Sequence, residues 1–199
     1  MRPIQPPYCP RCCLPVTSGE AHLCSRCLRE RLSFEAHRSY GIYEGTLKEA
    51  IHRFKYQGER QLVKVFGDLL YPLFQTAFHD HPVDLIAPVP LHIKRLRERG
   101  FNQSLLLARA LSKRTGIPYY GRLLKKIKHT PVQTELRGRE RRKNVKGAFR
   151  AEDIEIIGGK TIVLVDDVYT TGATINECAR TLLKAGAARV SAITLARAL

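Results

Sequence analysis

The sequence predicts an α/β protein with a doubly wound, mainly parallel sheet, preceded by a small cysteine-rich finger. Apolar runs typical of buried parallel strands alternate with amphipathic helical patterns, and five of the six cysteines fall within the first 27 residues. We see no internal repeat. We therefore expect a finger over residues 1–36 and one α/β domain over residues 37–199.

The elements of the α/β domain follow from hydrophobic periodicity. Short apolar runs that stop at prolines or polar turns predict strands, and apolar residues at helical spacing predict helices. Gly116 and Gly186 each follow a helical pattern, where glycine commonly ends a helix. Cys178 lies on an apolar helical stripe, so we expect an ordinary core residue there. The expected strands are 37–43, 84–90, 161–165 and 189–196, and the expected helices are 27–34, 47–56, 60–78, 102–115 and 175–185.

Four of the early cysteines form two Cys-x-x-Cys pairs separated by eleven residues. Two such pairs can close a tetrahedral zinc site, whereas disulfides need an oxidising compartment. Cys13 and His22 are alternative ligands, although their spacing fits less well. Four thiolates leave no open position on the ion, so we expect a structural Zn²⁺ that helps a short segment to fold. The expected ligands are Cys9, Cys12, Cys24 and Cys27.

Neither a membrane span nor a signal peptide is predicted. The longest uncharged run covers only residues 69–79, whereas a helix needs about 20 apolar residues to cross a bilayer. The N-terminal stretch MRPIQPPYCP lacks the apolar segment of a signal peptide. We therefore expect a cytoplasmic protein without membrane insertion.

Positive charge is concentrated in one part of the chain. The formal net charge is +16, and residues 92–150 carry 18 lysines and arginines against three glutamates, a local charge of +15. Such a concentration is expected where a protein meets phosphate, in a nucleotide-like ligand or along a nucleic-acid backbone. A solvated face that only aids solubility is the other interpretation.

Residues 163–174 read VLVDDVYTTGAT and join an acidic pair to a turn of small and hydroxylated residues. Asp166 and Asp167 stand where a strand ends, the edge at which open α/β sheets bind ligands. The turn leads into a helix whose free N–H groups suit a phosphate. Because a phosphate repels carboxylates, the acidic pair fits vicinal hydroxyls or Mg²⁺, and a sugar 5-phosphate satisfies both halves. The expected phosphate-binding residues are Thr170, Thr171, Gly172, Ala173 and Thr174.

Competing motifs are missing from the sequence. There is no GxxxxGK[ST] of a Walker A loop and no GxGxxG after a strand. A receiver-type acidic pair would need a phosphoacceptor aspartate on a later strand, and no aspartate follows Asp167. A chance acidic turn that caps a helix is the remaining structural explanation.

VLVDDVYTTGAT resembles the phosphoribosyl-pyrophosphate (PRPP) motif of type I phosphoribosyltransferases. Together with the two Cys-x-x-Cys pairs and VPLHIKRLRERGFNQS, it resembles the ComF family of competence proteins, GntX-like members included, over essentially the whole chain. The resemblance implies a four-cysteine zinc finger joined to a sheet of the type I phosphoribosyltransferase kind. It also implies Mg²⁺ bound with PRPP, and a cytoplasmic role with other DNA-uptake proteins in natural transformation.

The resemblance assigns roles to individual residues. It implies that Asp166 and Asp167 hold the ribose 2- and 3-hydroxyls and that residues 170–174 cradle the 5-phosphate. The basic segment 90–100 corresponds in position to the family's pyrophosphate loop. Arginine is the better bidentate partner for phosphate oxygens, although each of these arginines could instead be surface charge. The expected diphosphate-binding residues are His92, Arg95, Arg99 and Gly100.

Residues 128–149 correspond to the family's mobile catalytic loop and are polar and basic. Transfer from PRPP passes through an oxocarbenium-like state with a departing diphosphate. A lid that excludes water and brings cations to the leaving group would assist that step. The expected catalytic residues are Asp166, Asp167, Arg139 and Arg142.

Two functions remain open from the sequence. One is a binding module that holds PRPP and Mg²⁺ and grips single-stranded DNA. The other is an active phosphoribosyltransferase with an unidentified nucleobase or amine acceptor and no direct DNA contact. Consumption of PRPP over time, with and without DNA, distinguishes them. Tyr119, Tyr120 and Phe149 are candidates for stacking on bases, although we expect core packing for at least two of them.

Overall fold

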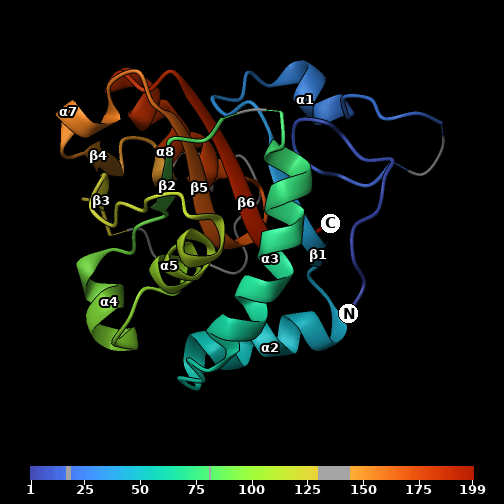
Figure 1. Cartoon of the computed structure of the whole chain (residues 1–199), viewed down its shortest axis with the longest axis horizontal. Coiled ribbons are helices and arrows are strands. Elements are labelled where there is room, and N and C mark those ends of the chain that lie inside the picture. The colour runs from blue at the N-terminus through green and yellow to red at the C-terminus, as the bar shows by residue number, and fades with distance from the viewer. Residues whose placement is uncertain (17–18, 81, 130–143) are drawn as a thin grey trace.

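A four-stranded parallel sheet forms the centre of the molecule. The computed structural model describes residues 1–16, 19–80, 82–129 and 144–199. The strands lie in the order β1-β6-β5-β2, and every neighbouring pair is parallel, so each pairing needs a crossover connection (Figure 1). The bounds are β1 His37–Ile42, β2 Leu85–Pro88, β5 Thr161–Tyr169 and β6 Arg189–Arg197.

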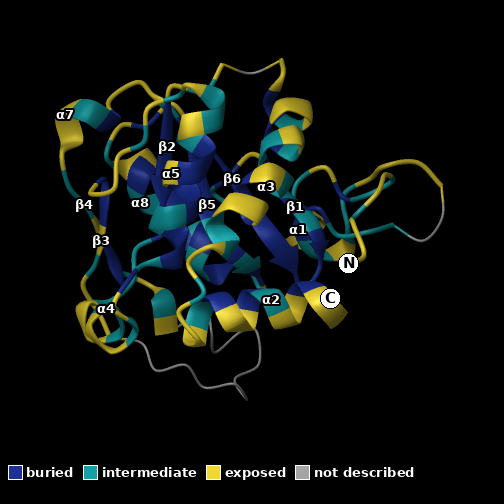
Figure 2. Ribbon diagram, turned by 60° about the horizontal axis from the view of Figure 1, so that its bottom comes forward, coloured by how far each residue is buried: buried dark blue, intermediate teal, exposed yellow. Residues whose placement is uncertain are grey.

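Helices cover both faces of this sheet, which confirms the predicted doubly wound α/β class. One face carries α2, α3 and α5, and their apolar side chains form a buried cluster with Val163, Val165 and Ile193. The other face carries α8 and the finger, around Ile162, Leu164 and others. The strands are the most continuously buried part of the chain (Figure 2). The bounds are α2 Gly45–Tyr56, α3 Leu62–Phe78, α5 Gln103–Thr115 and α8 Ala173–Lys184.

Smaller elements complete the described fold. The finger contains α1, and a short α7 precedes β5. Two short antiparallel strands, β3 and β4, pair at the two ends of the basic segment 128–149. None of the helices within the described residues is both long enough and apolar enough to cross a membrane. The bounds are α1 Ser25–Arg29, β3 Leu124–Lys126, β4 Phe149–Ala151 and α7 Ile154–Ile157.

Two local features differ from the sequence-based expectation. β5 does not end at residue 165 but continues to Tyr169, because its pairing with β6 extends to the Tyr169–Arg197 register. The acidic pair therefore lies inside the strand. Residues 93–99 form a helix, α4 (Ile93–Arg99), where the resemblance implied a loop. His92 caps its start by accepting from the Lys94 N–H, and Gly100 ends it in the left-handed conformation.

The finger packs directly against the sheet. Its cysteines share one buried apolar cluster with Phe34, Leu164 and Val190. At the N-terminus, the Ile4 N–H donates to the Tyr40 carbonyl at 2.9 Å, so this segment lies beside β1. Burial against the sheet compensates for the small core of a segment of this length.

The aromatic candidates for base stacking are mostly committed to packing. Phe149 is buried in the apolar cluster under α8, and Tyr119 packs against the cluster under α5. Tyr120 has an exposed fraction of 38%. Core packing for two of the three agrees with the expectation.

Candidate functional site

The four cysteines of the two Cys-x-x-Cys pairs converge. Their sulfur atoms all lie within 4.8 Å of one another, and the Cys12 and Cys24 Sγ atoms are 3.7 Å apart. A tetrahedral site with Zn–S distances of about 2.3 Å requires sulfurs about 3.8 Å apart. The donor set Cys9, Cys12, Cys24 and Cys27 therefore fits a metal ion such as zinc.

Backbone N–H groups of the finger favour the thiolate form of Cys9. Burial opposes ionisation of Cys9, but backbone N–H groups of Cys24, Cys12 and Arg11 point at it and lower the pKa of its thiol to about 7. The Cys24 N–H donates to the Cys9 Sγ at 3.5 Å. Burial raises the pKa of Cys12 to about 11. A metal cation would compensate for this burial by stabilising all four thiolates.

The two alternative ligands lie elsewhere. Cys13 has a left-handed backbone with φ of 58°, and its Sγ faces the Ser39 carbonyl of β1 at 4.0 Å. His22 is exposed, and its Nδ1 lies 2.9 Å from the Glu20 carbonyl. Neither belongs to the cysteine cluster, so the paired spacing selects the correct set.

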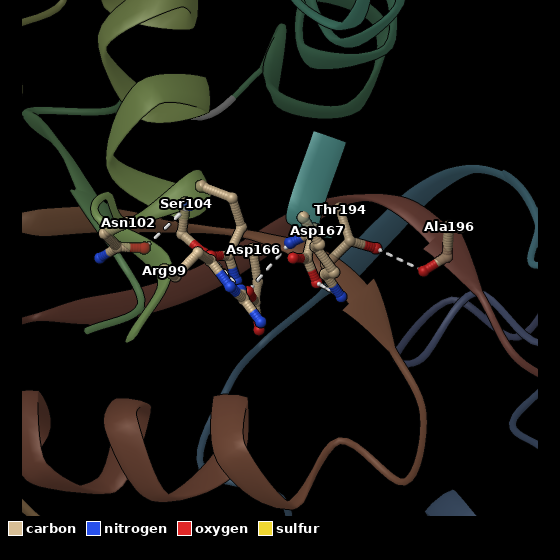
Figure 3. A network of polar contacts seen from close by, with 9 residues as sticks. Arg99, Asn102, Ser104, Asp166, Asp167, Thr194 and Ala196 are labelled. Atoms are coloured by element: carbon tan, nitrogen blue, oxygen red, sulfur yellow. Dashed lines mark hydrogen bonds and ion pairs between the residues drawn. The ribbon is translucent and has the colours of Figure 1, made fainter. Parts of the chain in front are cut away.

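The acidic pair lies near the end of β5, and its two side chains have different partners (Figure 3). The Asp166 Oδ1 accepts from the Ser104 hydroxyl at 2.8 Å and from the Asp167 N–H at 2.9 Å. The Asp167 Oδ1 forms a 2.7 Å ion pair with Lys55 of α2. Asp167 is buried, and its Oδ2 has no hydrogen-bond partner among the described residues.

Burial and mutual repulsion shape the electrostatics of this pair. Burial raises the pKa of Asp166 from 3.8 to about 7, and the neighbouring Asp167 carboxylate adds to the rise, against the Ser104 hydrogen bond. Burial works to lower the pKa of Lys55, but the ion pair with Asp167 raises it overall. Lys55 pairs with Asp167 and also lies within electrostatic reach of Asp166, so a further positive charge near Asp166 would stabilise the ionised form of that carboxyl.

The predicted phosphate turn follows β5 directly. Gly172 precedes α8 in the left-handed conformation, with φ of 66°, and Thr170 is exposed. The first N–H groups of α8 have no partner inside the helix, and the Ala173 N–H donates to the Thr171 hydroxyl at 3.4 Å. The turn thus presents donors at a helix start, a few residues beyond the acidic pair, with Thr174 in the first turn of α8.

Part of the predicted diphosphate-binding set lies beside the acidic pair. Arg99 donates to the Gln103 Oε1 at 2.6 Å and its guanidinium lies 5.1 Å from the centre of the Tyr56 ring. Gln103 is next to Ser104, so Arg99 belongs to the contact network that reaches Asp166 (Figure 3). Arg99 and the basic residues before it lie on the helix α4 and not on a loop.

The other members of that set are held by the ends and face of α4. Arg95 is partly buried and lies 3.7 Å from the Glu98 carboxylate. The His92 ring lies 5.1 Å from the His129 ring, and its pKa is lowered by burial and by nearby positive charge. Gly100 closes the helix. Arg139 and Arg142 lie outside the described residues.

Sequence reasoning missed three residues of the site. Lys55 lies far from the motif in the chain and has no local pattern that marks it. Ser104 belongs to the NQS of the quoted VPLHIKRLRERGFNQS segment, but its role depends on where α5 begins. Lys126 of β3 is within electrostatic reach of Asp166, and its pKa is lowered by burial.

A cleft of about 480 Å³ opens between the finger and α8. Ala173, the residue after the phosphate turn, lies on its wall. The two carboxylates that line the cleft form ion pairs, Glu30 with Arg26 and Glu177 with Arg180. The remaining lining residues are Arg31, Leu32, Val145, Lys146 and Asn176.

Comparison with known proteins gives consistent relationships. Residues 102–199 match the phosphoribosyl transferase domain family. The chain is 36% identical to competence protein F of Haemophilus influenzae, over 96% of this chain and 85% of that protein. It is 34% identical to competence protein ComFC of Bacillus subtilis, over 85% and 68%. Adenine phosphoribosyltransferase of Saccharomyces cerevisiae is a structural neighbour with 16% identity and a TM-score of 0.45, over 73% and 72%.

The raised pKa of Asp166 predicts an unusual pH dependence of stability. Between about pH 4 and pH 7 the folded protein keeps a proton that the unfolded chain has lost, so this carboxyl contributes stability that declines as pH rises and levels off above pH 7. Asp166→Asn should remove that decline. The free energy of unfolding of the variant, measured relative to that of the wild type by urea unfolding, should therefore rise by on the order of 2 kcal/mol from pH 5 to pH 8.

The matched control is Glu49→Gln, an exposed carboxylate on α2. Its unfolding free energy should follow that of the wild type across the same range. Parallel pH profiles for wild type and Asp166→Asn would show that Asp166 titrates normally.

Proposed function

Because the chain belongs to the ComF family of competence proteins, we propose that it binds PRPP with Mg²⁺ in the cytoplasm and acts on single-stranded DNA during natural transformation. The observation that carries the proposal is the acidic pair of β5 immediately before a phosphate turn at the start of α8. This arrangement matches a ligand with a 5-phosphate and free ring hydroxyls.

The partners of the acidic pair support a defined role for each carboxylate. Lys55 forms a 2.7 Å ion pair with the buried Asp167, which offsets the cost of burying that carboxylate. The Ser104 hydroxyl orients Asp166 toward hydroxyls of the ribose. Burial and the neighbouring Asp167 carboxylate raise the pKa of Asp166, so Mg²⁺ that accompanies a diphosphate would stabilise its ionised form.

Cations around α4 support binding of the diphosphate. Arg99 is already fixed by Gln103 and Tyr56, so little side-chain freedom is lost when it binds an anion. Arg95 lies one helical turn earlier on the same side of α4. A planar guanidinium suits bidentate contact with phosphate oxygens. We assign the diphosphate to this side of the acidic pair.

The four-cysteine cluster supports a structural zinc ion. All four donors are sulfurs, which leaves no open coordination position for a substrate. Bound zinc would fix the two Cys-x-x-Cys turns and thereby the part of the finger that packs on the sheet. We assign residues 1–36 to this finger and residues 37–199 to the phosphoribosyltransferase domain.

The surplus of positive charge supports contact with nucleic acid. Residues 92–150 carry a net charge of +15, more than one diphosphate requires. Among the described residues, Lys94, Arg97, Lys128 and Lys146 are exposed and have no carboxylate partner. An extended phosphate backbone is the natural partner for such charge, and other DNA-uptake proteins would act at the same strand.

Phosphoribosyl transfer to an unidentified acceptor is the second candidate. The cleft between α1 and α8 favours it, because this space adjoins the phosphate turn and has apolar walls at Leu32 and Val145. Consumption of PRPP that does not depend on DNA would establish this transferase, whereas PRPP that is bound but not consumed supports the binding module.

PRPP binding should depend on the acidic pair. The double variant Asp166→Asn, Asp167→Asn should bind PRPP with Mg²⁺ at least about tenfold more weakly, or about 1.4 kcal/mol, in isothermal titration calorimetry. The control is Asp84→Asn, at the opposite end of β5, where the carboxylate accepts from the Thr161 N–H. Equal affinity of the double variant and the wild type would place the ribose elsewhere.

Zinc content should depend on the paired cysteines. The purified wild type should contain one zinc ion per chain by elemental analysis, and Cys24→Ser, Cys27→Ser should contain none. Cys13→Gly is the control, because glycine suits the left-handed backbone of that position and the thiol faces β1. Unchanged stoichiometry in the double variant would refute the assignment.

DNA binding should depend on the basic segment. Affinity for a single-stranded oligonucleotide should fall by roughly 0.7 log units per phosphate contact for each tenfold increase in salt. Changing Arg139, Arg141, Arg142 and Lys143 to glutamine should weaken binding and flatten that slope. The control changes four exposed cations elsewhere to glutamine, Arg2, Lys48, Lys64 and Lys184, with the same change in net charge. Identical slopes for the two variants would mean that the basic segment does not contact DNA specifically and is only a solvated surface.

A further inference from the structure

Tyr169, the last residue of β5, lies between the finger and the phosphate turn. Its exposed fraction is 1%, and its ring stacks on the His37 ring with centroids 4.1 Å apart and planes 22° apart. The Arg197 guanidinium lies 4.7 Å from the centre of the same ring. The strand ends of β1, β5 and β6 thus supply a buried, ordered stack of three side chains.

Both neighbours of Tyr169 contact one carbonyl of the finger. The Cys12 carbonyl accepts from the Arg197 Nη1 at 2.7 Å, and the His37 Nδ1 lies 3.2 Å from the same oxygen. Because a carbonyl can only accept, the Nδ1 of His37 carries the proton. Cys12 is also a member of the metal-binding cluster. The position of its carbonyl is therefore tied to the geometry of the sulfurs.

The other end of Tyr169 touches the phosphate turn. A Cβ atom at Gly172 would lie only 2.2 Å from the Tyr169 hydroxyl oxygen, so the turn rests directly on this side chain. The hydroxyl is buried and has no hydrogen-bond partner among the described residues. Packing against His37, Arg197 and the turn therefore holds the ring in place.

We propose that Tyr169 is a positioning residue that couples the metal-bound finger to the phosphate turn, through Arg197 and His37 on one side and Gly172 on the other. Metal bound at the cysteines fixes the Cys12 carbonyl, which orders the stack and holds the turn in its phosphate-binding conformation. This inference rests on the proposed zinc and PRPP sites. By thermodynamic linkage, PRPP should in turn strengthen metal binding.

The test is hydrogen exchange of the turn amides in zinc-loaded and zinc-free protein. In the wild type, removal of zinc should speed exchange at residues 170–176 at least about fivefold, the lower end of typical coupling between sites, while α3 is unaffected. In Tyr169→Leu the turn should exchange quickly with or without zinc. Tyr169→Phe keeps the stacked ring and should behave as the wild type.

Phe149→Leu controls for the loss of a buried aromatic side chain outside this stack and should keep the zinc dependence. Wild-type turn amides that do not respond to zinc, a response that includes α3 equally, or a zinc response retained in Tyr169→Leu would each overturn the proposal. Calorimetry with PRPP is run on the same samples. Absence of PRPP binding in all of them would refute the proposed function, while hydrogen exchange decides the role of Tyr169 independently.

Discussion

Parallel pairing of β5 with β6 is the constraint on which the site depends. This pairing extends through Asp166 to Tyr169, and it holds three functional side chains on rigid backbone. A strand that ended at residue 165 would leave the acidic pair on a mobile turn. Because the carboxylates instead project from the sheet, α5 can supply Ser104 to one and α2 can supply Lys55 to the other. The helices on one face are thus positioned by the same core that positions the carboxylates.

Holding two carboxylates so close to a core costs stability, and the structure offsets that cost only in part. Lys55 compensates for Asp167, but one Asp167 oxygen stays unpartnered and Asp166 has a strongly raised pKa. Buried polar groups without partners usually have an explanation in function. Here the unpartnered atom, the Asp167 Oδ2, belongs to the acidic pair on which the proposed function rests.

The sequence predicted the fold class and the convergence of four of its cysteines well because both depend on local patterns. Apolar runs and helical periodicity mark the strands and helices, and the spacing of two Cys-x-x-Cys pairs distinguishes Cys9 from Cys13. The partners of the acidic pair could not be found this way. Lys55 ends an amphipathic helix with no special feature, and only the packing of α2 brings its ammonium within 2.7 Å of Asp167.

Boundaries were harder to predict for a related reason. The apolar run of β5 stops at Val165, but its hydrogen bonds continue because β6 remains alongside. Similarly, the basic residues before Gly100 gave no apolar stripe, yet His92 and Gly100 supply caps at both ends of a seven-residue helix. In β5 the decisive interactions are backbone hydrogen bonds, and in α4 they are the His92 side-chain cap and the left-handed backbone of Gly100, neither of which appears in the pattern of apolar residues.

The finger and the domain depend on each other through backbone groups as well as through apolar contact. The finger is too small to bury its own core, so its cysteines share the cluster that contains Leu164 and Tyr169. The Cys12 carbonyl, in turn, accepts from the Nη1 of the buried Arg197 guanidinium, whose Nε has no partner among the described residues. A charged group with an exposed fraction of 5% needs such a partner. We therefore expect that the domain depends on the finger for its packing. The finger supplies a hydrogen-bond acceptor and apolar contacts to residues at the ends of β1, β5 and β6.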